Sequence, residues 1–375
     1  MREYMKLAFW LSVCAVVYTF AGYPILLLFL RLFIHRPVRK NHIEPYVTLV
    51  VPAYNEREVI GTKIRNAASL DYPVNKLEVL IASDGSSDDT VEIAQRSSDG
   101  SRIRVLAFSQ NRGKISVLND AVREARGEII VFSDASAILD SDSIRQLVAN
   151  FADPEVGAVS GIYRVQRASE SRLGPAEEIY WKYETFLKIQ ESSLASILGG
   201  HGQILGVRKD RYPYPAAGTV NDDYVIPVRV LASGSRVVYE PLAAAFEEAS
   251  EMVGFQRRVR IMAGNMQQLR EIKGLFWPPQ PLPLFFFLSH KIVRSLVPFF
   301  LVSLAISNSF LLRGRFYQLT GLFQLSFYGL ALAGSRWQLK PGSLRVPYYF
   351  CFVNAAYLWS AFRSSFNTRR VMRWK

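Results

Sequence analysis

One apolar stretch near the start of the chain limits what the whole protein can fold into. Residues 7–33 read LAFWLSVCAVVYTFAGYPILLLFLRLF, and the first charge in this stretch is Arg31. A helix of about 20 apolar residues crosses the ~30 Å hydrocarbon layer of a membrane, so the stretch is long enough to span it. It is too long for a secretory signal and lacks a convincing small-residue cleavage site. We therefore predict a retained membrane helix.

Basic residues lie at the end of this stretch and directly after it: Arg31, Arg36, Arg39 and Lys40. Lys and Arg beside a span mark its cytoplasmic side. We therefore expect residues 1–40 to form an N-terminal transmembrane helix with a basic juxtamembrane segment. The domain that follows is expected in the cytoplasm, and the protein is expected in the inner membrane of a bacterium.

Membrane character returns after Trp277. Three further apolar stretches are candidate spans: 295–312, 316–333 and 346–362. The aromatic segment ahead of them carries Lys291 and Arg294, and this combination suits a helix lying in the membrane interface. Residues 276–375 are thus expected to hold an interfacial helix and C-terminal transmembrane helices. One span before the domain and three after it would place the basic tail outside, against the positive-inside rule. The number of true spans therefore stays open.

The chain carries a formal net charge of +13. Cytoplasmic loops, anionic lipid headgroups and an anionic substrate all suit this charge. It is scattered and accompanies no nucleic-acid-binding motif, so we expect no nucleic-acid partner. The two cysteines lie in apolar stretches and the four histidines show no metal-ligand spacing. A disulfide framework and a zinc site are therefore not indicated.

Between the membrane segments, short apolar runs alternate with helical patterns. Five runs are predicted as strands: 47–51, 77–82, 103–108, 129–132 and 156–160. Three helical patterns separate them: 56–69, 90–96 and 114–126. Alternation at this spacing predicts βαβ units in a mainly parallel sheet, which is the α/β fold class.

Polar motifs follow four of these strands in the order AYNE, SDGSSDD, NRGK and SDAS. Ligands of parallel α/β sheets bind beyond the carboxyl ends of the strands, so we expect the four motifs to converge on one crevice. Each motif also has a plainer interpretation. Asp134 in SDAS and the acids of SDGSSDD are residue types that cap helices and form turns.

The set of motifs closely resembles the membrane-integrated family 2 glycosyltransferases, which include polysaccharide synthases and lipid-directed glycosyltransferases. The resemblance runs from about residue 47 to 267. It rests on VVPAYNE at 50–56, SDGSSDDT at 83–90, NRGK at 111–114, FSDAS at 132–136 and NDD at 221–223. It implies a Rossmann-like GT-A fold, which we assign to residues 41–275, and it fits the flanking membrane helices.

The resemblance also implies which residues bind a nucleotide diphospho-sugar. By this resemblance, four residues match the positions at which the family binds the nucleobase and ribose: Ala53, Tyr54, Glu56 and Asp84. Gly85 would let the backbone approach the ligand, and Lys114 at a helix start would pair with phosphate. Arg257 and Arg260 fit the family's (Q/R)xxRW element and would clamp the diphosphate. Lys114 alternatively is a solvated lysine, and the arginines alternatively belong to a helix that binds headgroups.

An expected metal site departs from the family pattern. The family has Asp-x-Asp after this strand, whereas this chain has Asp134 followed by Ser136 in the second acidic position. Mg²⁺ and Mn²⁺ prefer oxygen ligands, and one or two carboxylates beside substrate phosphates suffice. Since serine supplies a neutral oxygen, we expect Asp134 and Ser136 to bind Mg²⁺ or Mn²⁺ more weakly.

The resemblance assigns the general base to Asp223, the last acid before a helix predicted over 224–231. A base needs a carboxylate whose pKa is tuned by burial or by neighbours, and Asp222 is adjacent. Five residues are expected at the acceptor: Gly200, His201, Gly202, Gln203 and Asp222. The plainer alternatives are a helix-capping Asp and a flexible glycine connection.

The expected function is therefore inverting sugar transfer from a nucleotide diphospho-sugar, with UDP as the expected nucleotide. The acceptor would be a lipid-linked or growing glycan at the cytoplasmic membrane face. Membrane lipids and a membrane biosynthesis complex are further expected partners. Two alternatives stay open. One is a processive synthase that secretes its polymer, although Ile261 replaces the Trp of the (Q/R)xxRW element. The other is a non-catalytic scaffold that binds sugar nucleotides.

Overall fold

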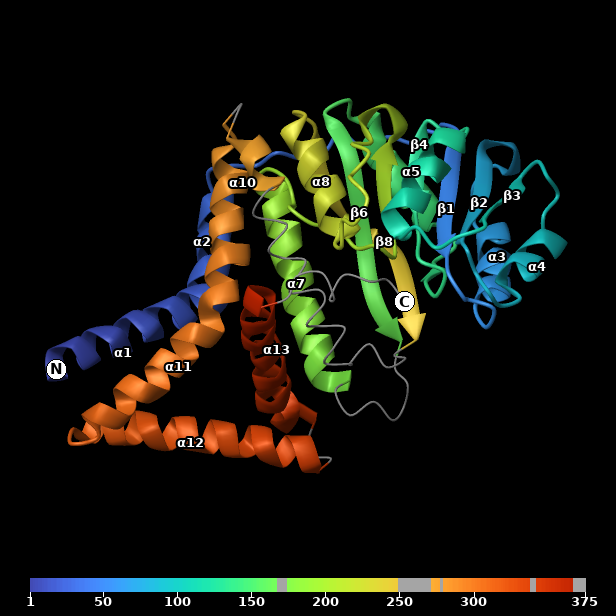
Figure 1. The fold of residues 1–375 in the computed structure, drawn as a ribbon. Helices are drawn as coiled ribbons and strands as arrows, with labels where there is room; N and C mark the ends of the chain where they lie inside the picture. Colours follow the sequence, from blue (N-terminus) through green and yellow to red (C-terminus); the bar gives the residue numbers. More distant parts are fainter. Residues whose placement is uncertain (167–173, 249–270, 277–278, 338–341, 367–375) are drawn as a thin grey trace.

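A mixed β-sheet forms the centre of the protein (Figure 1). The computed structural model describes residues 1–166, 174–248, 271–276, 279–337 and 342–366. Within these ranges the sheet has eight strands in the order β3-β2-β1-β4-β7-β6-β8-β5. Their bounds are Val47–Ala53 (β1), Leu77–Asp84 (β2), Ile103–Phe108 (β3), Ile129–Phe132 (β4), Ile138–Leu139 (β5), Val156–Gln166 (β6), Leu205–Arg208 (β7) and Arg236–Glu248 (β8).

The first four strands form the parallel half of the sheet. β1 pairs in parallel with β2 and β4, and β2 pairs in parallel with β3. β7 then joins β4 and β6 in antiparallel fashion. The carboxyl ends of β1 to β4 therefore meet at one edge, as the alternation of strands and helices predicted. The α/β class is confirmed, and the rest of the sheet is mixed: β7 pairs antiparallel with β4 and β6, β6 pairs in parallel with β8, and β8 pairs antiparallel with β5.

Helices cover both faces of the sheet (Figure 1). Their bounds are Ile60–Ala68 (α3), Thr90–Arg96 (α4), Lys114–Glu124 (α5), Ser143–Ala149 (α6), Gly174–Leu194 (α7) and Asp222–Ala232 (α8). Successive strand residues point to opposite faces, so Val50 packs into the cluster that contains α5 and α8. Leu49 and Val51 pack into the cluster that contains α3 and α6. Burial on both faces explains why the strands are apolar throughout.

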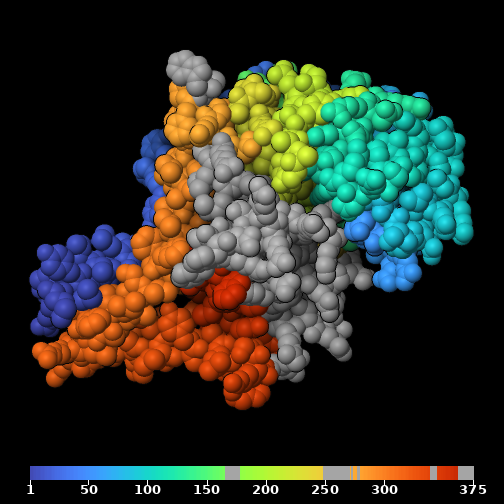
Figure 2. Space-filling model, viewed as in Figure 1, coloured from blue at the N-terminus to red at the C-terminus, as the bar shows by residue number. Residues whose placement is uncertain are grey.

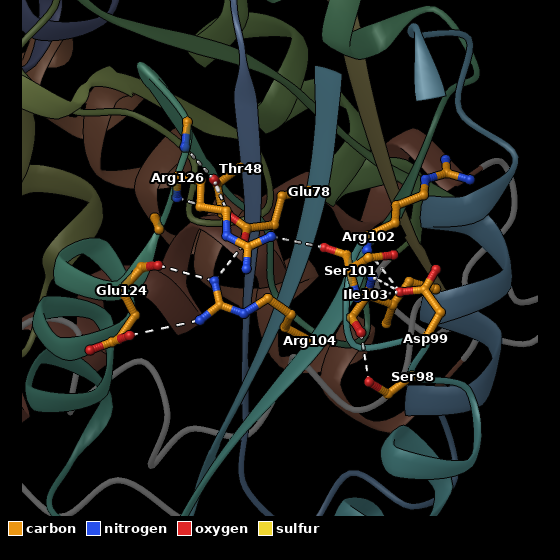
Figure 3. A network of polar contacts seen from close by, with 12 residues as sticks. Thr48, Glu78, Ser98, Asp99, Ser101, Arg102, Ile103, Arg104, Glu124 and Arg126 are labelled. Atoms are coloured by element: carbon orange, nitrogen blue, oxygen red, sulfur yellow. Dashed lines mark hydrogen bonds and ion pairs between the residues drawn. The ribbon is translucent and has the colours of Figure 1, made fainter. Parts of the chain in front are cut away.

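A buried polar network lies at the opposite end of the strands from the motifs (Figure 3). Glu78, the second residue of β2, is fully buried. Its carboxylate accepts hydrogen bonds from Thr48 Oγ1 at 2.6 Å, Arg104 at 2.6 Å and the Arg126 backbone N–H at 2.9 Å. A buried carboxylate needs such partners. This network accordingly stabilises the sheet and lies apart from the candidate site.

Two long apolar helices lie side by side next to the sheet domain (Figures 1 and 2). The first, Arg2–Arg31, joins α1 (Arg2–Val17), a π-helical turn (Tyr18–Gly22) and α2 (Tyr23–Arg31). The second, Pro281–Leu311, joins α10 (Pro281–Phe286), η6 (Phe287–Val293) and α11 (Arg294–Leu311). The hydroxyls of Ser12 and Ser303 meet between them at 3.1 Å.

By length and composition, these two helices are the ones among the described residues that can cross a membrane. The segment predicted as a separate interfacial helix before Ser295 continues without a break into the second of them. Helices α12 (Arg315–Arg336) and α13 (Val346–Phe366) cover the other two predicted spans. By length and apolar composition together, their described residues do not qualify as membrane spans. Apolar side chains such as Leu11, Phe299 and Phe323 are exposed on the surface of these helices.

Candidate active site

The first two strand-end motifs are joined to each other by hydrogen bonds. Asn55 adopts the left-handed conformation, with φ of 56°, which turns the chain sharply after β1. Its backbone N–H donates to Ser86 Oγ at 3.1 Å, and its side-chain oxygen accepts the Ser87 N–H at 2.8 Å. The Glu56 N–H donates to Thr90 Oγ1 at 2.8 Å. AYNE and SDGSSDD therefore form one rigid corner of the site.

Asp84 and Gly85 hold the third motif in place. Asp84 is fully buried, and its two carboxylate oxygens accept the N–H groups of Arg112 and Gly113 at 2.8 Å each. Gly85 has φ of +69°, and a Cβ there would lie 2.5 Å from the backbone carbon of Gln110. From the sequence, both residues are predicted to contact the donor. In the structure Gly85 allows close packing of two loops, and Asp84 orients the start of α5.

Ala53 and Tyr54 take the positions expected at the end of β1. Ala53 is the last residue of that strand and is fully buried, whereas Tyr54 is partly exposed. Arg257 and Arg260, the expected diphosphate clamp, lie outside the described residues. The donor-side geometry therefore rests on the four strand-end motifs.

Lys114 brings the third and fourth motifs together with the NDD motif. Its ammonium lies 2.9 Å from Asp134 Oδ1 and 3.0 Å from Asp222 Oδ2. Burial alone would lower the pKa of Lys114, but the two carboxylates outweigh burial and raise it. A Cβ at Gly202 would lie 3.5 Å from Asp134 Oδ2 and 3.6 Å from Lys114 Nζ. The predicted convergence of motifs on one site is thus visible in the side chains.

Glu247 is a site residue that the sequence analysis missed. The Ser136 hydroxyl donates to Glu247 Oε1 at 2.6 Å, and the Tyr163 hydroxyl donates to Glu247 Oε2 at 3.1 Å. Burial, followed by the charges of Asp134, Asp88 and Glu247, raises the pKa of Glu56 to about 7. Glu247 lies at the end of β8, far along the chain from the other motifs, and no sequence motif marks it.

The donor set suits a hard divalent cation that is also held by substrate. Asp134 and Glu247 offer carboxylates, and Ser136 offers a neutral oxygen. Within the described part of the chain, no group of three or more His, Cys, Asp or Glu side chains forms a preassembled metal cluster. Mg²⁺ and Mn²⁺ commonly bind one or two carboxylates plus substrate phosphates. The residues therefore fit a cation that arrives with a diphosphate.

Lys63 was also missed, because it sits within an ordinary amphipathic helix pattern. It is fully buried beneath the SDAS loop. Its ammonium donates to Ser133 Oγ and to the Ala137 carbonyl, both at 2.6 Å. Burial lowers the pKa of Lys63 to about 7, against the pull of the Asp134 charge. Lys63 thus fixes both ends of the loop that presents Asp134.

Asp223 lies near the start of α8, in an environment that raises the pKa of its carboxyl group. Burial and then the Asp222 charge raise the pKa of Asp223 to about 6, against the opposing charges of Lys114, Lys188 and Lys291. The N-cap of α8 is Asn221, so the capping alternative for Asp223 does not apply. A carboxylate with this pKa is mostly ionised at neutral pH and can still accept a proton, as a general base must.

The glycine-rich loop runs from Asp223 to the SDAS loop. The Gly200 N–H donates to the Asp223 backbone carbonyl at 2.6 Å, and the Gln203 carbonyl accepts the Ser133 hydroxyl at 2.8 Å. His201 is buried, and its backbone N–H donates to Ser160 Oγ at 2.9 Å. Burial, with help from the Lys188 charge, holds the pKa of His201 well below its usual value. The loop is ordered by these contacts and separates Asp223 from Asp134.

Asp222 forms an ion pair with Lys114 at 3.0 Å. Its expected contact with the acceptor stays a prediction. Asp223, in contrast, is influenced by the charges of three lysines: Lys114, Lys188 and Lys291.

The chain resembles known proteins in sequence and in fold. Residues 48–211 match the family described as glycosyl transferase family 2. The poly-beta-1,6-N-acetyl-D-glucosamine synthase of Staphylococcus aureus (strain COL) is 29% identical over 233 residues, which cover 60% of this chain and 55% of that protein. The synthase of the same name from Staphylococcus epidermidis is 27% identical over 242 residues, covering 62% of this chain and 57% of the relative. This chain thus matches little more than half the length of these curated relatives.

Among solved structures, a mannosyltransferase from Pyrobaculum calidifontis in complex with GDP-Man and Mn²⁺ has a similar fold. Its TM-score is 0.72 at 22% sequence identity, and the alignment covers 98% of this chain and 99% of that chain. The likeness therefore includes the terminal helices as well as the sheet domain, which has the GT-A fold.

Proposed function

We propose that this chain, whose residues 48–211 match the family described as glycosyl transferase family 2, is an inverting glycosyltransferase. The proposed donor is a nucleotide diphospho-sugar, with UDP as the expected nucleotide. The proposed acceptor is a hydroxyl group of a lipid-linked or growing glycan at the cytoplasmic face of a membrane. The observation that supports this best is a tuned carboxylate, Asp223, separated by one ordered loop from the Asp134–Lys114–Asp222 cluster.

The proposed reaction is a single displacement. Asp223 accepts the proton of the acceptor hydroxyl, whose oxygen forms a bond to the anomeric carbon of the donor sugar. The bond from that carbon to the diphosphate breaks on the opposite side, which inverts the configuration. Lys114 supplies positive charge where the diphosphate departs. The products are the glycosylated acceptor, the nucleoside diphosphate and a proton held by Asp223.

A divalent cation bound with the donor would neutralise charge on the leaving diphosphate. Asp134, Ser136 and Glu247 are the proposed protein ligands. Asp134 is held toward this position by Lys63 beneath its loop and by Lys114 beside it. Ser136 is neutral, so the second carboxylate of the proposed site comes from Glu247.

We expect Ser136→Asp to tighten the binding of Mn²⁺ in the presence of nucleoside diphosphate, and Asp134→Asn to weaken it at least tenfold. The first variant adds a carboxylate and the second removes one. Titration of Mn²⁺ by electron paramagnetic resonance gives the affinities without any need for activity. Ser97→Asp, at an exposed position after α4, is the matched control. Unchanged Mn²⁺ affinity in both site variants, or full transfer in excess chelator, would show that the cation site is wrongly assigned.

A processive polysaccharide synthase is the second candidate. It is favoured by the matched staphylococcal relatives, whose names describe synthases of a polysaccharide. Ile261 in place of Trp in the arginine element disfavours it. The length of the product distinguishes the two, because a single-transfer enzyme adds one sugar to each acceptor.

The function is tested by feeding membranes that contain the protein a panel of UDP- and GDP-sugars. Mass spectrometry of the lipid-soluble and polymeric fractions should reveal one new glycosylated product that depends on the protein. A ladder of long polymers would favour the processive synthase. If every donor in the panel stays intact, or is bound without any transfer or hydrolysis, the non-catalytic scaffold is the better description.

A further inference from the structure

Lys188 on α7 is a buried cation with an unusual environment. Its side chain is nearly inaccessible, with the residue 6% exposed. Its ammonium donates to the Gly200 carbonyl at 3.3 Å and to His201 Nε2 at 3.2 Å, and it lies over the Tyr239 ring. Among the described residues it forms no ion pair with a carboxylate. Burying an ammonium without an ion pair is costly, so a role beyond packing is indicated.

The acidic neighbours of Lys188 on the same helix are engaged elsewhere. Glu191 accepts the Tyr23 hydroxyl at 2.6 Å and His290 Nδ1 at 2.7 Å. Glu184 pairs with Arg294, and it lies 3.4 Å from His290 Nε2. These partners come from the two long apolar helices. The charge of Lys188 is therefore directed to the other side of α7, toward the glycine-rich loop.

That loop connects Lys188 to Asp223 in two steps. Lys188 holds the carbonyl of Gly200, and the N–H of Gly200 donates to the Asp223 backbone carbonyl at 2.6 Å. Gly199 lies beside the same turn, since a Cβ there would be 3.8 Å from the Asp223 carbonyl oxygen. The position of the loop against α8 thus depends on a bond from Lys188.

We propose that Lys188 is a positioning residue for Asp223. It holds the loop of Gly200 and His201 against the start of α8, and its fixed positive charge keeps the Asp223 carboxylate ionised at neutral pH. This inference rests on the proposed function, in which Asp223 is the base. It extends that function to a residue that no sequence motif identified.

The sign of the pH effect follows from the charged groups around the base. Asp222 on α8 faces Asp223 with a negative charge, and Lys114 on α5, Lys188 on α7 and Lys291 on η6 face it with positive charges. The pKa of Asp223 is raised to about 6 even in the presence of these lysines. Removing the Lys188 charge removes a stabilising partner of the carboxylate, so the pKa of Asp223 must rise further.

Lys188 itself is charged over the range that matters. Burial and the nearby Lys291 charge lower the pKa of Lys188 to about 8, against the pull of Glu184, Asp223 and Glu191. Between pH 6 and pH 8 Asp223 is therefore ionised while Lys188 is protonated. This is the window in which Lys188 supports the base, and neutral pH lies inside it.

The test is the pH dependence of kcat/KM for transfer, measured with the membrane-embedded protein. Lys188→Met should move the acidic limb of the profile upward by about one pH unit, with the largest loss of activity below pH 7. Lys188→Gln should move the limb in the same way, because it removes the charge but keeps a donor for the Gly200 carbonyl. Lys188→Arg should leave the limb close to wild type, because it keeps the charge.

Lys182→Met is the matched control, since Lys182 lies on the same helix with a side chain 74% exposed. An acidic limb that stays in place in both uncharged variants would overturn the proposal. Failure of both to fold would also overturn it, by giving Lys188 a role in stability instead. Absence of transfer in the wild-type protein would instead reject the proposed function, so the two failures are distinguishable.

Discussion

Asp223→Asn is expected to abolish sugar transfer while nucleotide-sugar binding stays near wild type. The amide has nearly the shape of the carboxylate, but it cannot accept the proton of the acceptor hydroxyl. Loss of a general base costs about 10²–10⁴-fold in rate, which places the variant close to background. The Lys114 bridge to Asp134 and Asp222 does not involve Asp223, so the donor side keeps its contacts.

Transfer by this variant is measured by mass spectrometry of the product, and donor binding by calorimetry with the purified protein. Asp210→Asn is the matched control, because the Asp210 side chain is 73% exposed in the segment before α8. Turnover within a few-fold of wild type would remove Asp223 as the base. Loss of donor binding together with transfer would instead assign Asp223 to the donor pocket.

Arg294→Leu is expected to destabilise the protein by about 3–5 kcal/mol, because it leaves a buried carboxylate without its main partner. Arg294 pairs with Glu184 where the second apolar helix packs on α7, and both side chains are nearly buried. Burial would raise the pKa of Glu184, but Arg294 and then His290 outweigh it and hold that pKa well below its usual range. Without Arg294, the ionised carboxylate loses most of this support.

Thermal unfolding in detergent measures this effect. The double variant Glu184→Leu/Arg294→Leu should recover much of the lost stability, because it removes both charges together. Arg313→Leu, at an exposed position after α11, is the control. A single variant as stable as wild type would show that the pair contributes little. Arg294, which the sequence predicts in the membrane interface, thus also pairs with a carboxylate of the sheet domain.

The parallel half of the fold could be predicted closely from the sequence. The bounds of β3, β4 and α4 coincide with the predicted ranges, because each element is a short pattern ended by a turn or a polar motif. β7 and β8 were not predicted. β7 pairs antiparallel with β4, and β8 pairs in parallel with β6; both partners are distant along the chain, and long-range pairing leaves little signal in a single short run.

The candidate site was likewise predicted only in part. The motifs predicted which residues gather, and Asp134, Lys114 and Asp222 do gather. They did not predict which atoms meet, such as the hydrogen bonds from the loop before α5 to Asp84 and the close approach of Gln110 to Gly85; the expected contacts of these two residues with the donor stay predictions. The roles of Lys63, Glu247 and Lys188 depend on tertiary packing, and no local pattern distinguishes a buried lysine in a helix from an exposed one.

Helix α7 has a consequence for how this protein can evolve. One side of it binds Tyr23, His290 and Arg294 from the two apolar helices, and the other side holds the loop beside Asp223. A helix pair that only tethered the domain would be freely exchangeable for any other anchor. Here an exchange would leave two buried carboxylates, Glu184 and Glu191, without their partners. The apolar helices and the sheet domain must therefore change together. The two apolar helices and the sheet domain are thus coupled through the buried carboxylates of α7, and a change in one is expected to require a compensating change in the other.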